Sequence, residues 1–384
     1  MQKQAVAEVL LVKPDVSFIR RVIGAGGGDL KKCMQCGTCS AVCELAPETQ
    51  PFPRRQMLEA QWGLKSRVLA DPAIWLCHYC GDCTARCPRG ARPGDVMAAL
   101  RREAVRHFAA PAWMGAAVAS PRALWALFLL PALIFAAIAA FSGQSGPAGA
   151  MEFAHMFPIA VLEAVFFAVA GIVIVMFAIG LARFVGALRA SGYKQAILPG
   201  LLPSLGEILA HSRFAQCREH RDQRLGHLLT LWGFLGLGVV GTAVGVGHML
   251  GLLRTPLPLA NPFKVLANIS ALIILVGSLM LLVNRLKDPA RRAASTYFDW
   301  FFLLVLVGVV ATGIASELLR LAQLAAMYAV YFVHLVLVFA LFLYAPYSKF
   351  AHLAYRTVAM AVCRPYRAGS ARPAETAGAV EVRV

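Results

Sequence analysis

Charged side chains are scarce in this 384-residue chain: they make up 15% of it, against about 25% in an ordinary soluble domain. Hydrophobic residues supply 59% of the chain. Intrinsic disorder is excluded for the chain as a whole, because disorder goes with low hydrophobicity and high charge. Long apolar runs also exclude an ordinary soluble enzyme.

Acidic residues are fewer than basic ones, which leaves a formal net charge of +17. A basic excess can indicate nucleic-acid binding, but in such proteins the basic side chains gather on one soluble face. Here much of the positive charge lies between apolar runs. The sequence therefore predicts a lipid membrane as a partner and no nucleic acid.

The first residues, Met1 to Lys13, lack a long apolar core and a small-residue cleavage site, so no secretory signal is predicted. Eight of the ten cysteines lie between Cys33 and Cys87. In a reducing compartment, clustered cysteines favour metal binding over disulfides. We therefore expect metal sites in this part of the chain.

Six apolar runs are each long enough to cross a bilayer, which takes about 20 residues. They are 122–141, 157–183, 226–250, 263–285, 297–319 and 326–348. The predicted fold class is all-α: an N-terminal cysteine-rich helical domain precedes a six-helix transmembrane bundle. The predicted domains are a cytoplasmic cluster domain (1–110), a membrane domain (111–360) and a disordered tail (361–384).

The loops differ in lysine and arginine content, which sets the expected orientation. Those between spans two and three and between spans four and five are basic, whereas loop 142–156 has no lysine or arginine. With six spans, both basic loops fall on the same side as the two termini. The cluster domain and C-terminus are therefore predicted on the cytoplasmic side of the inner membrane. Segment 197–215 is predicted to be an amphipathic helix that either binds lipid headgroups or simply connects two spans.

Two cysteine runs share the spacing C-x2-C-x2-C-x3-C. This is the ferredoxin run for [4Fe–4S] clusters, in which the fourth cysteine ligates the other cluster. One cluster is predicted on Cys33, Cys36, Cys39 and Cys87, and the second on Cys77, Cys80, Cys83 and Cys43. Zinc knuckles and structural disulfides are the alternatives.

Helical patterns surround these runs, over 54–69 and 96–107. Gly37 and Gly81 are expected to relieve crowding beside the cluster sulfides. The glycine-rich stretch 24–28 hints at a dinucleotide loop, but no strand-plus-helix unit follows, so a linker is preferred. Another possible metal-ligand group (His211, Cys217 and His220) lacks a fourth ligand, and a cytoplasmic loop is preferred there.

Four histidines lie in or beside the predicted spans, where ionisable side chains are rare and often functional. His227 and His248 bracket span three, 21 residues or about 31 Å apart. His334 and His352 lie 18 residues, or five helical turns, apart, so one helix would present both on one face. Since the two spans run in opposite directions, His227 should meet His352 near the cytoplasm and His248 should meet His334 near the outer side.

Two stacked bis-histidine b haems would account for these four side chains, and we expect one or two haems. The predicted fold is therefore an α-helical ferredoxin-like di-cluster domain followed by a six-helix transmembrane haem b bundle. Glycines of span three would let a flat macrocycle approach the backbone, or they are ordinary helix-packing residues. These glycines are Gly233, Gly236, Gly238, Gly241 and Gly245. Interfacial histidines without a ligand are the alternative, and His155 competes with His248 as the outer ligand.

The chain resembles two known modules joined together. The N-terminal part is similar to the C subunit of heterodisulfide reductase in its cysteine runs and in the stretches 87–90 (Cys-Pro-Arg-Gly) and 96–101 (Val-Met-Ala-Ala-Leu-Arg). Residues 158–360 resemble the haem b subunit of respiratory nitrate reductase, above all over 334–338 (His-Leu-Val-Leu-Val) and 346–349 (Pro-Tyr-Ser-Lys). The fusion is similar to the C subunits of quinone-interacting membrane-bound oxidoreductase (Qmo) complexes.

This resemblance implies His227, His334 and His352 as haem ligands. It also exposes a departure at Leu237, where the related subunit has its remaining ligand; His248 must replace it, or the outer haem is absent. The Qmo resemblance implies soluble flavin and iron–sulfur partner subunits resembling the A subunit of heterodisulfide reductase. It also implies a link to adenylylsulfate reductase in sulfur metabolism.

A quinone site needs a hydrogen-bonding or proton-exchanging side chain beside an apolar slot. On the outer side the candidates are Lys264, Asn268, Glu163 and His155, and on the cytoplasmic side Asp299. Lys264 also lies close to the place of a quinol-binding lysine in the nitrate reductase relative. A lysine that only extends to the membrane interface is an equal interpretation.

These features predict an oxidoreductase subunit that transfers electrons between a membrane quinone and cytoplasmic partners through haem b and two clusters. One alternative is a haem b quinol dehydrogenase subunit of another heterodisulfide-reductase-like or sulfite-reductase-associated complex. The other is a membrane anchor whose clusters have no redox role.

Overall fold

The structure is a computed structural model that describes residues 13–47, 50–142, 151–219 and 222–367. The described residues are 75% helical and form no β-strand, so the predicted all-α class is confirmed. The absence of a strand within these ranges also leaves the glycine-rich stretch 24–28 without the strand that a dinucleotide loop follows.

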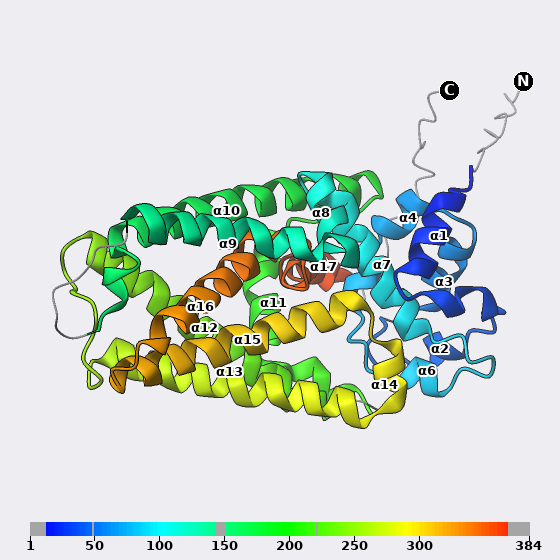
Figure 1. Cartoon of the computed structure of the whole chain (residues 1–384). Coiled ribbons are helices and arrows are strands. Elements are labelled where there is room, and N and C mark those ends of the chain that lie inside the picture. Colours follow the sequence, from blue (N-terminus) through cyan, green and yellow to red (C-terminus); the bar gives the residue numbers. More distant parts are fainter. Residues whose placement is uncertain (1–12, 48–49, 143–150, 220–221, 368–384) are drawn as a thin grey trace, which may run out of the picture.

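Within the residues that the structure describes, six helices are long and apolar enough to cross a membrane, as predicted. They are α9 (Leu124–Ser142), α10 (Ile159–Ala190), α12 (Gln223–Met249), α13 (Pro262–Lys287), α15 (Tyr297–Leu321) and α16 (Ala326–Leu343). The N-terminal helices gather at one end of this bundle (Figure 1). The short helix α14 (Pro289–Ala294), in the second basic loop, lies at that same end (Figure 1).

The last span ends earlier than predicted. Helix α16 stops at Leu343, a 3-10 turn η5 (Ala345–Tyr347) follows, and the separate helix α17 runs from Ala351 to Arg367. Pro346 explains the break, because proline lacks an N–H and its ring clashes with the carbonyl four residues back. The prediction that one straight helix presents His334 and His352 on a common face is therefore wrong.

The tail also begins later than predicted. Residues 361–367 belong to the predicted disordered tail, but they continue helix α17 as far as Arg367. Buried side chains such as Val362 and Cys363 hold this last part of the helix against the core. The remainder of the predicted tail, 368–384, lies outside the described residues.

Short helices build the N-terminal domain. They are α1 (Val16–Gly24), η1 (Gly28–Lys32), α2 (Thr38–Ala41), α3 (Arg54–Gln61), α4 (Lys65–Leu69), α5 (Ala73–Leu76), α6 (Asp82–Ala85) and α7 (Pro93–Phe108). The helical pattern over 54–69 is interrupted at Gly63, whose φ of +68° suits glycine best. Helix α8 (Ala112–Val118) then connects the domain to α9.

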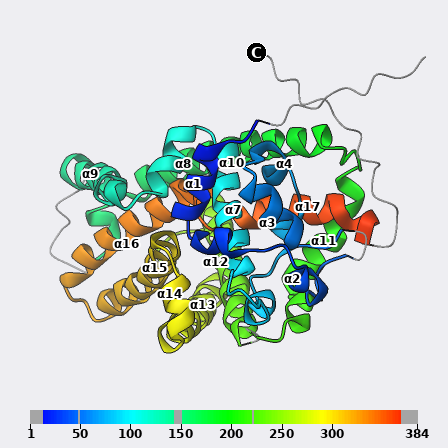
Figure 2. The same ribbon diagram turned by 90° about the vertical axis from the view of Figure 1, so that its right-hand side faces the viewer.

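The N-terminal domain and the membrane part share one hydrophobic core. Trp75 of α5 stacks on Tyr355 of α17, with ring centroids 5.1 Å apart, and meets the edge of Phe184 of α10 at 6.0 Å. All three side chains are buried. Figure 2 looks onto this end of the molecule and shows α17 beside α11 (Leu198–Ala210); α17 also contacts α5. The cysteine runs are thus fixed against the ends of the membrane helices.

Replacing Trp75 by alanine is expected to destabilise the protein by about 3–5 kcal/mol, because a large cavity would open between three helices. Trp62→Ala is the matched control, since Trp62 is 58% exposed and should change stability by no more than about 0.5 kcal/mol. The measurement is the free energy of unfolding by denaturant in detergent. Equal effects of the two substitutions would contradict a shared core at Trp75.

Candidate functional site

The two cysteine runs form loops with matching backbone conformations. The residue before the second cysteine, Gln35 or Tyr79, has φ of +62° or +59°, and the glycine after it, Gly37 or Gly81, has φ of +89° in both runs. The third cysteine of each run lies on a short helix, α2 or α6, and these helices contact each other. Each run therefore forms the same kind of tight loop, as expected for a duplicated cluster-binding motif.

A pocket in the N-terminal domain brings together the four residues predicted for the second cluster. Cys77, Cys80 and Cys83 line it together with Cys43, which comes from the first run. Burial, and next the neighbouring Cys77, raise the pKa of the Cys43 thiol to about 12. Bound iron reverses this preference, because a metal ion binds the thiolate and drives off the proton. The half-buried set of four sulfur donors therefore fits a [4Fe–4S] cluster.

The residues predicted for the first cluster differ in exposure: Cys39 is buried, and Cys33 and Cys87 are half-buried. Burial, and next the adjacent Cys33, raise the pKa of the Cys39 thiol to about 11, whereas Cys36 is exposed. Gln35 donates a hydrogen bond to the sulfur of Cys33 at 3.3 Å. The structure places Cys87 against the same core as Cys33, half-buried, with the N–H of Ala91 donating to its sulfur at 3.3 Å.

Two guanidinium groups approach the second run. Arg101 of α7 donates to the carbonyl of Cys77 at 2.7 Å, and Arg356 of α17 donates to the same oxygen at 3.3 Å. Burial lowers the pKa of Arg356 to about 10, so its side chain remains protonated at neutral pH. Two positive charges beside this loop would stabilise the negative charge of thiolates and sulfides.

The two histidines predicted for the inner haem, His227 and His352, lie close together. The turn η5 separates α16 from α17, and His352 lies at the start of α17. The ring centroids of His227 and His352 are 6.3 Å apart. Two imidazoles that bind one iron are expected to have ring centroids about 6 Å apart. This distance is the sum of two iron–nitrogen bonds of about 2 Å and about 1 Å from each nitrogen to its ring centre. Burial lowers the pKa of His352 to about 4, and the neutral imidazole is the form that binds metals. The separation of the two imidazoles therefore fits one haem iron, which this pair would hold.

All four candidate haem ligands have the same nitrogen engaged. Nδ1 of His227 hydrogen-bonds His211 at 2.7 Å, Nδ1 of His352 donates to the carbonyl of Lys349, Nδ1 of His334 donates to the carbonyl of Val309 at 3.0 Å, and Nδ1 of His248 contacts Glu163 at 2.9 Å. Within the described ranges, Nε2 of these rings makes no hydrogen bond. This arrangement is usual for histidines that bind a metal through Nε2.

The outer pair is less closely joined than the inner pair. No ring contact between described residues joins His248 to His334. His334 instead lies against Gly313 of α15, where an added Cβ would come within 2.9 Å of the imidazole ring. Leu237 packs in an apolar cluster with buried residues of α13 and α15.

The glycines of α12 do not form a common surface for a macrocycle. A Cβ added at Gly233 or Gly236 would collide with Ser270 of α13, and Gly245 faces Phe167 of α10. Gly238 and Gly241 face open space on the exposed side of the helix. At Gly233 and Gly236 the packing interpretation therefore holds: these glycines let α12 lie close to α13.

The predicted quinone-site residues fall into separate groups. Lys264 forms an ion pair with Glu317 at 2.7 Å, and Asn268 donates to the same carboxylate at 3.2 Å. Glu163 is joined to His248 instead, and His155 ends the short 3-10 turn η3 (Phe153–His155). The sequence does not single out Glu317 as a member of this polar group, because one acidic residue near the end of an apolar run belongs to no recognisable motif.

Asp299, the candidate on the other side, is part of a structural junction. Its carboxylate accepts hydrogen bonds from the N–H and hydroxyl of Thr296 at 2.8 Å and so caps α15. It also pairs with Arg102 of the N-terminal domain at 3.5 Å and with Lys349. These contacts tie α7, α15 and the turn before α17 together.

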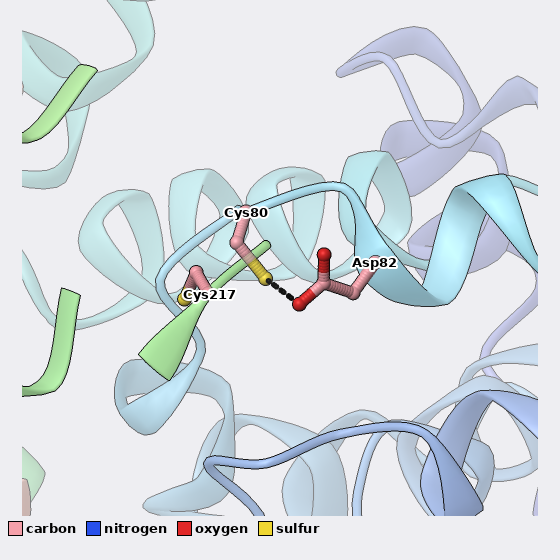
Figure 3. Close-up of side chains that lie close together, drawn as sticks. All are labelled: Cys80, Asp82 and Cys217. Carbon is pink, nitrogen blue, oxygen red and sulfur yellow. Dashed lines mark hydrogen bonds between the residues drawn. The ribbon is translucent and has the colours of Figure 1, made fainter. Parts of the chain in front are cut away.

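The amphipathic helix predicted over 197–215 is shorter. Helix α11 ends at Ala210, His211 adopts a left-handed backbone conformation with φ of +48°, and the 3-10 turn η4 (Ser212–Gln216) follows. The predicted ligand group separates: His211 contacts His227, whereas Cys217 lies beside Cys80 and Asp82 (Figure 3). His220 lies outside the described residues.

Comparison with known proteins identifies the N-terminal part. The sequence profile of the 4Fe-4S dicluster domain matches residues 29–91. The C subunit of the H(2):CoB-CoM heterodisulfide,ferredoxin reductase of Methanothermobacter thermautotrophicus is 41% identical over 100 residues, which are 26% of this chain and 54% of that protein. The C subunit of the ferredoxin:CoB-CoM heterodisulfide reductase of Methanosarcina mazei is 42% identical over 86 residues, 22% of this chain and 53% of that protein.

These relatives match about a quarter of this chain. A protein of Archaeoglobus profundus, described as like the C subunit of heterodisulfide reductase, is 38% identical over 85 residues, 22% of this chain and 45% of that protein. The chain spans about half the length of the curated relatives it matches. No solved structure matches. The N-terminal part of this protein is therefore a 4Fe-4S dicluster domain like that of the C subunit of heterodisulfide reductase, and six apolar helices that fit a membrane domain follow it.

Proposed function

We propose that this protein is a membrane subunit of a redox complex and transfers electrons between a membrane quinone and soluble partners. Oxidation of a quinol releases two electrons and two protons, and bound haem b and [4Fe–4S] clusters would supply one-electron carriers for the two electrons. The observation that best supports this proposal is the contact between the second cysteine run and the inner histidine pair.

That contact is made by three aromatic rings and by the guanidinium group of Arg356. His78, inside the second run, meets Phe214 of η4 at 5.2 Å, and Phe214 meets His227 at 6.2 Å. From the other side, Arg356 of α17 contacts both His78 and the carbonyl of Cys77. A single side chain thus separates the second run from a proposed haem ligand. This supports an order in which the second cluster exchanges electrons with the inner haem.

The first run is suited to the opposite end of the path. Cys36 is exposed, and the neighbouring Met34 is 59% exposed. A partner protein that docks over this loop would come close to the first cluster. We propose flavin and iron–sulfur subunits resembling the A subunit of heterodisulfide reductase as these partners. The Qmo resemblance supports a further link to adenylylsulfate reductase in sulfur metabolism.

The quinone site is proposed at the other end of the bundle, around Lys264, Asn268 and Glu317. These side chains are largely removed from solvent and offer both a proton donor and a carboxylate. The length of α12, from Gln223 to Met249, separates this quinone site from the inner haem. Electrons from the quinone site would therefore need a second haem, held by His248 and His334, to reach the inner haem. The basic loops support a cytoplasmic location for the cluster domain.

The proposed function is tested by adding a quinol analogue to the oxidised, full-length protein in lipid nanodiscs. We expect b-type absorption bands of the reduced haem to develop with the quinol alone. Bands that develop with dithionite but not with any quinol would contradict quinone reactivity. Co-purification of a flavoprotein with the tagged chain would separate a Qmo-like role from service to another complex.

Phe214→Ala is expected to slow electron exchange between the second cluster and the inner haem by about tenfold, which corresponds to about 1.4 kcal/mol in activation free energy. The reason is that the ring filling the space between His78 and His227 would be lost. Phe298→Ala is the control, because Phe298 packs in a different cluster beside α8. The measurement is the rate of haem oxidation after rapid mixing, at unchanged haem and iron content. An unaltered rate would remove Phe214 from the path.

A further inference from the structure

One buried cysteine outside both runs lies against the second run. Cys217 follows η4 in the loop before α12, and its side chain is 2% exposed. Its sulfur, the sulfur of Cys80 and a carboxylate oxygen of Asp82 all lie within 4.8 Å of one another. Figure 3 shows the two sulfurs beside each other, with Asp82 on the far side of Cys80.

Backbone contacts hold Cys217 in this place. The N–H groups of Arg218 and Glu219 both donate to the carboxylate of Asp82, at 3.2 and 2.9 Å. The guanidinium of Arg218 also pairs with Glu44, the residue after Cys43, at 3.2 Å. Because a cysteine side chain is short, these contacts around the next two residues also fix its sulfur.

Cys80 is one of the four cysteines that line the pocket of the second cluster. On a bound cluster, Cys80 would be a thiolate and Cys217 a neutral thiol. A thiol at this distance can donate a hydrogen bond to the thiolate, and hydrogen bonds to the sulfurs help to set a cluster's reduction potential. The sulfur of Cys217 also lies within 4.8 Å of the sulfur of Cys80, which is a proposed cluster ligand.

We infer that Cys217 is a fifth cysteine of the second cluster site, which donates a hydrogen bond to Cys80 and replaces it as a ligand when Cys80 is absent. In that replacement, an iron–sulfur bond forms to Cys217 and the thiol proton passes to solvent, with no change in electron count. The inference rests on the proposed cluster at Cys77, Cys80, Cys83 and Cys43.

The test uses the purified full-length protein with Cys80→Ala, Cys217→Ala, both substitutions together, and Cys77→Ala as the matched control. We expect about eight non-haem iron atoms per chain in the unaltered protein and in Cys80→Ala, since two four-iron clusters remain. The double variant and Cys77→Ala should both lose iron from the second site, and electron paramagnetic resonance should show the loss of the same cluster signal.

Loss of the second cluster in Cys80→Ala alone would overturn the role of Cys217 as a replacement ligand. If instead Cys77→Ala keeps all its iron, the assignment of the second cluster itself fails. The two failures are therefore distinguishable in one set of samples.

The hydrogen bond is tested separately by redox titration of the two cluster signals. Cys217→Ala should keep all its iron, but the midpoint potential of the second cluster should fall while that of the first stays unchanged. Cys217→Ser keeps a donor and should lie close to the unaltered protein. Identical potentials in Cys217→Ala and the unaltered protein, or equal shifts in both clusters, would overturn this role.

Discussion

Replacing His352 by leucine is expected to halve the haem content of the purified protein, from about two b haems per chain to about one. His352 lies 6.3 Å from His227 between ring centroids, and leucine offers iron no ligand. A single remaining imidazole would leave a bound haem with one of its two proposed histidine ligands, because His211 is already hydrogen-bonded to His227 at 2.7 Å. The measurement is haem content per chain, together with the reduced-minus-oxidised spectrum.

His155→Leu is the matched control for this prediction. His155 ends the turn η3 before α10, whereas His352 lies in α17, and the proposed path assigns His155 no ligand role. The control should keep the haem content of the unaltered protein. An unchanged haem content in His352→Leu would remove the inner site, whereas loss of haem in His155→Leu would reassign the outer ligand to His155.

Replacing Cys43 by alanine is expected to destroy the second cluster and leave the first intact. Cys43 belongs to the first run by sequence, but it lines the pocket of Cys77, Cys80 and Cys83. The variant should lose up to about four of about eight iron atoms. Its electron paramagnetic resonance spectrum should lose the signal that Cys77→Ala loses and keep the signal that Cys36→Ala loses.

Cys363→Ala is the control for the cysteine substitutions, because Cys363 is buried in α17 outside both runs. It should keep both cluster signals. If Cys43→Ala lost the same signal as Cys36→Ala, each run would hold its own cluster. The exchange of fourth ligands between the runs would then be wrong.

The features that sequence predicts well here depend on local patterns. Runs of about 20 apolar residues predict six spans, because few other structures accommodate them. The repeated cysteine spacing predicts a dicluster domain. The assignment of Cys43 to the cluster of Cys77, Cys80 and Cys83 stays a prediction, although the four residues line one pocket. Predicting the spans and the dicluster domain needs no knowledge of distant contacts.

Local patterns were insufficient at the prolines. Helix α9 continues through Pro131, but the chain around Pro346 leaves the helix and turns toward α17. An apolar run with one proline looks alike in both places. The difference comes from tertiary contacts, including the hydroxyl of Tyr347, which donates to the carbonyl of Ala110 at 2.6 Å.

The side chains that connect the sites were also beyond local patterns. Phe214, His211 and Cys217 lie in a loop that is far in sequence from Cys80 and His78. Their importance follows only from the docking of this loop on the second run. A single phenylalanine or cysteine in a basic loop has no spacing that would distinguish it.

The central claim is that one chain joins a dicluster domain to a haem-containing quinone path, and cofactor stoichiometry tests it most directly. The protein should be produced with adequate haem and iron supply, purified in detergent, and assayed for haem b and non-haem iron in the same sample. The account predicts about two b haems and about eight non-haem iron atoms per chain. Full iron content with no haem b would contradict the quinone path and leave only a membrane-anchored dicluster protein.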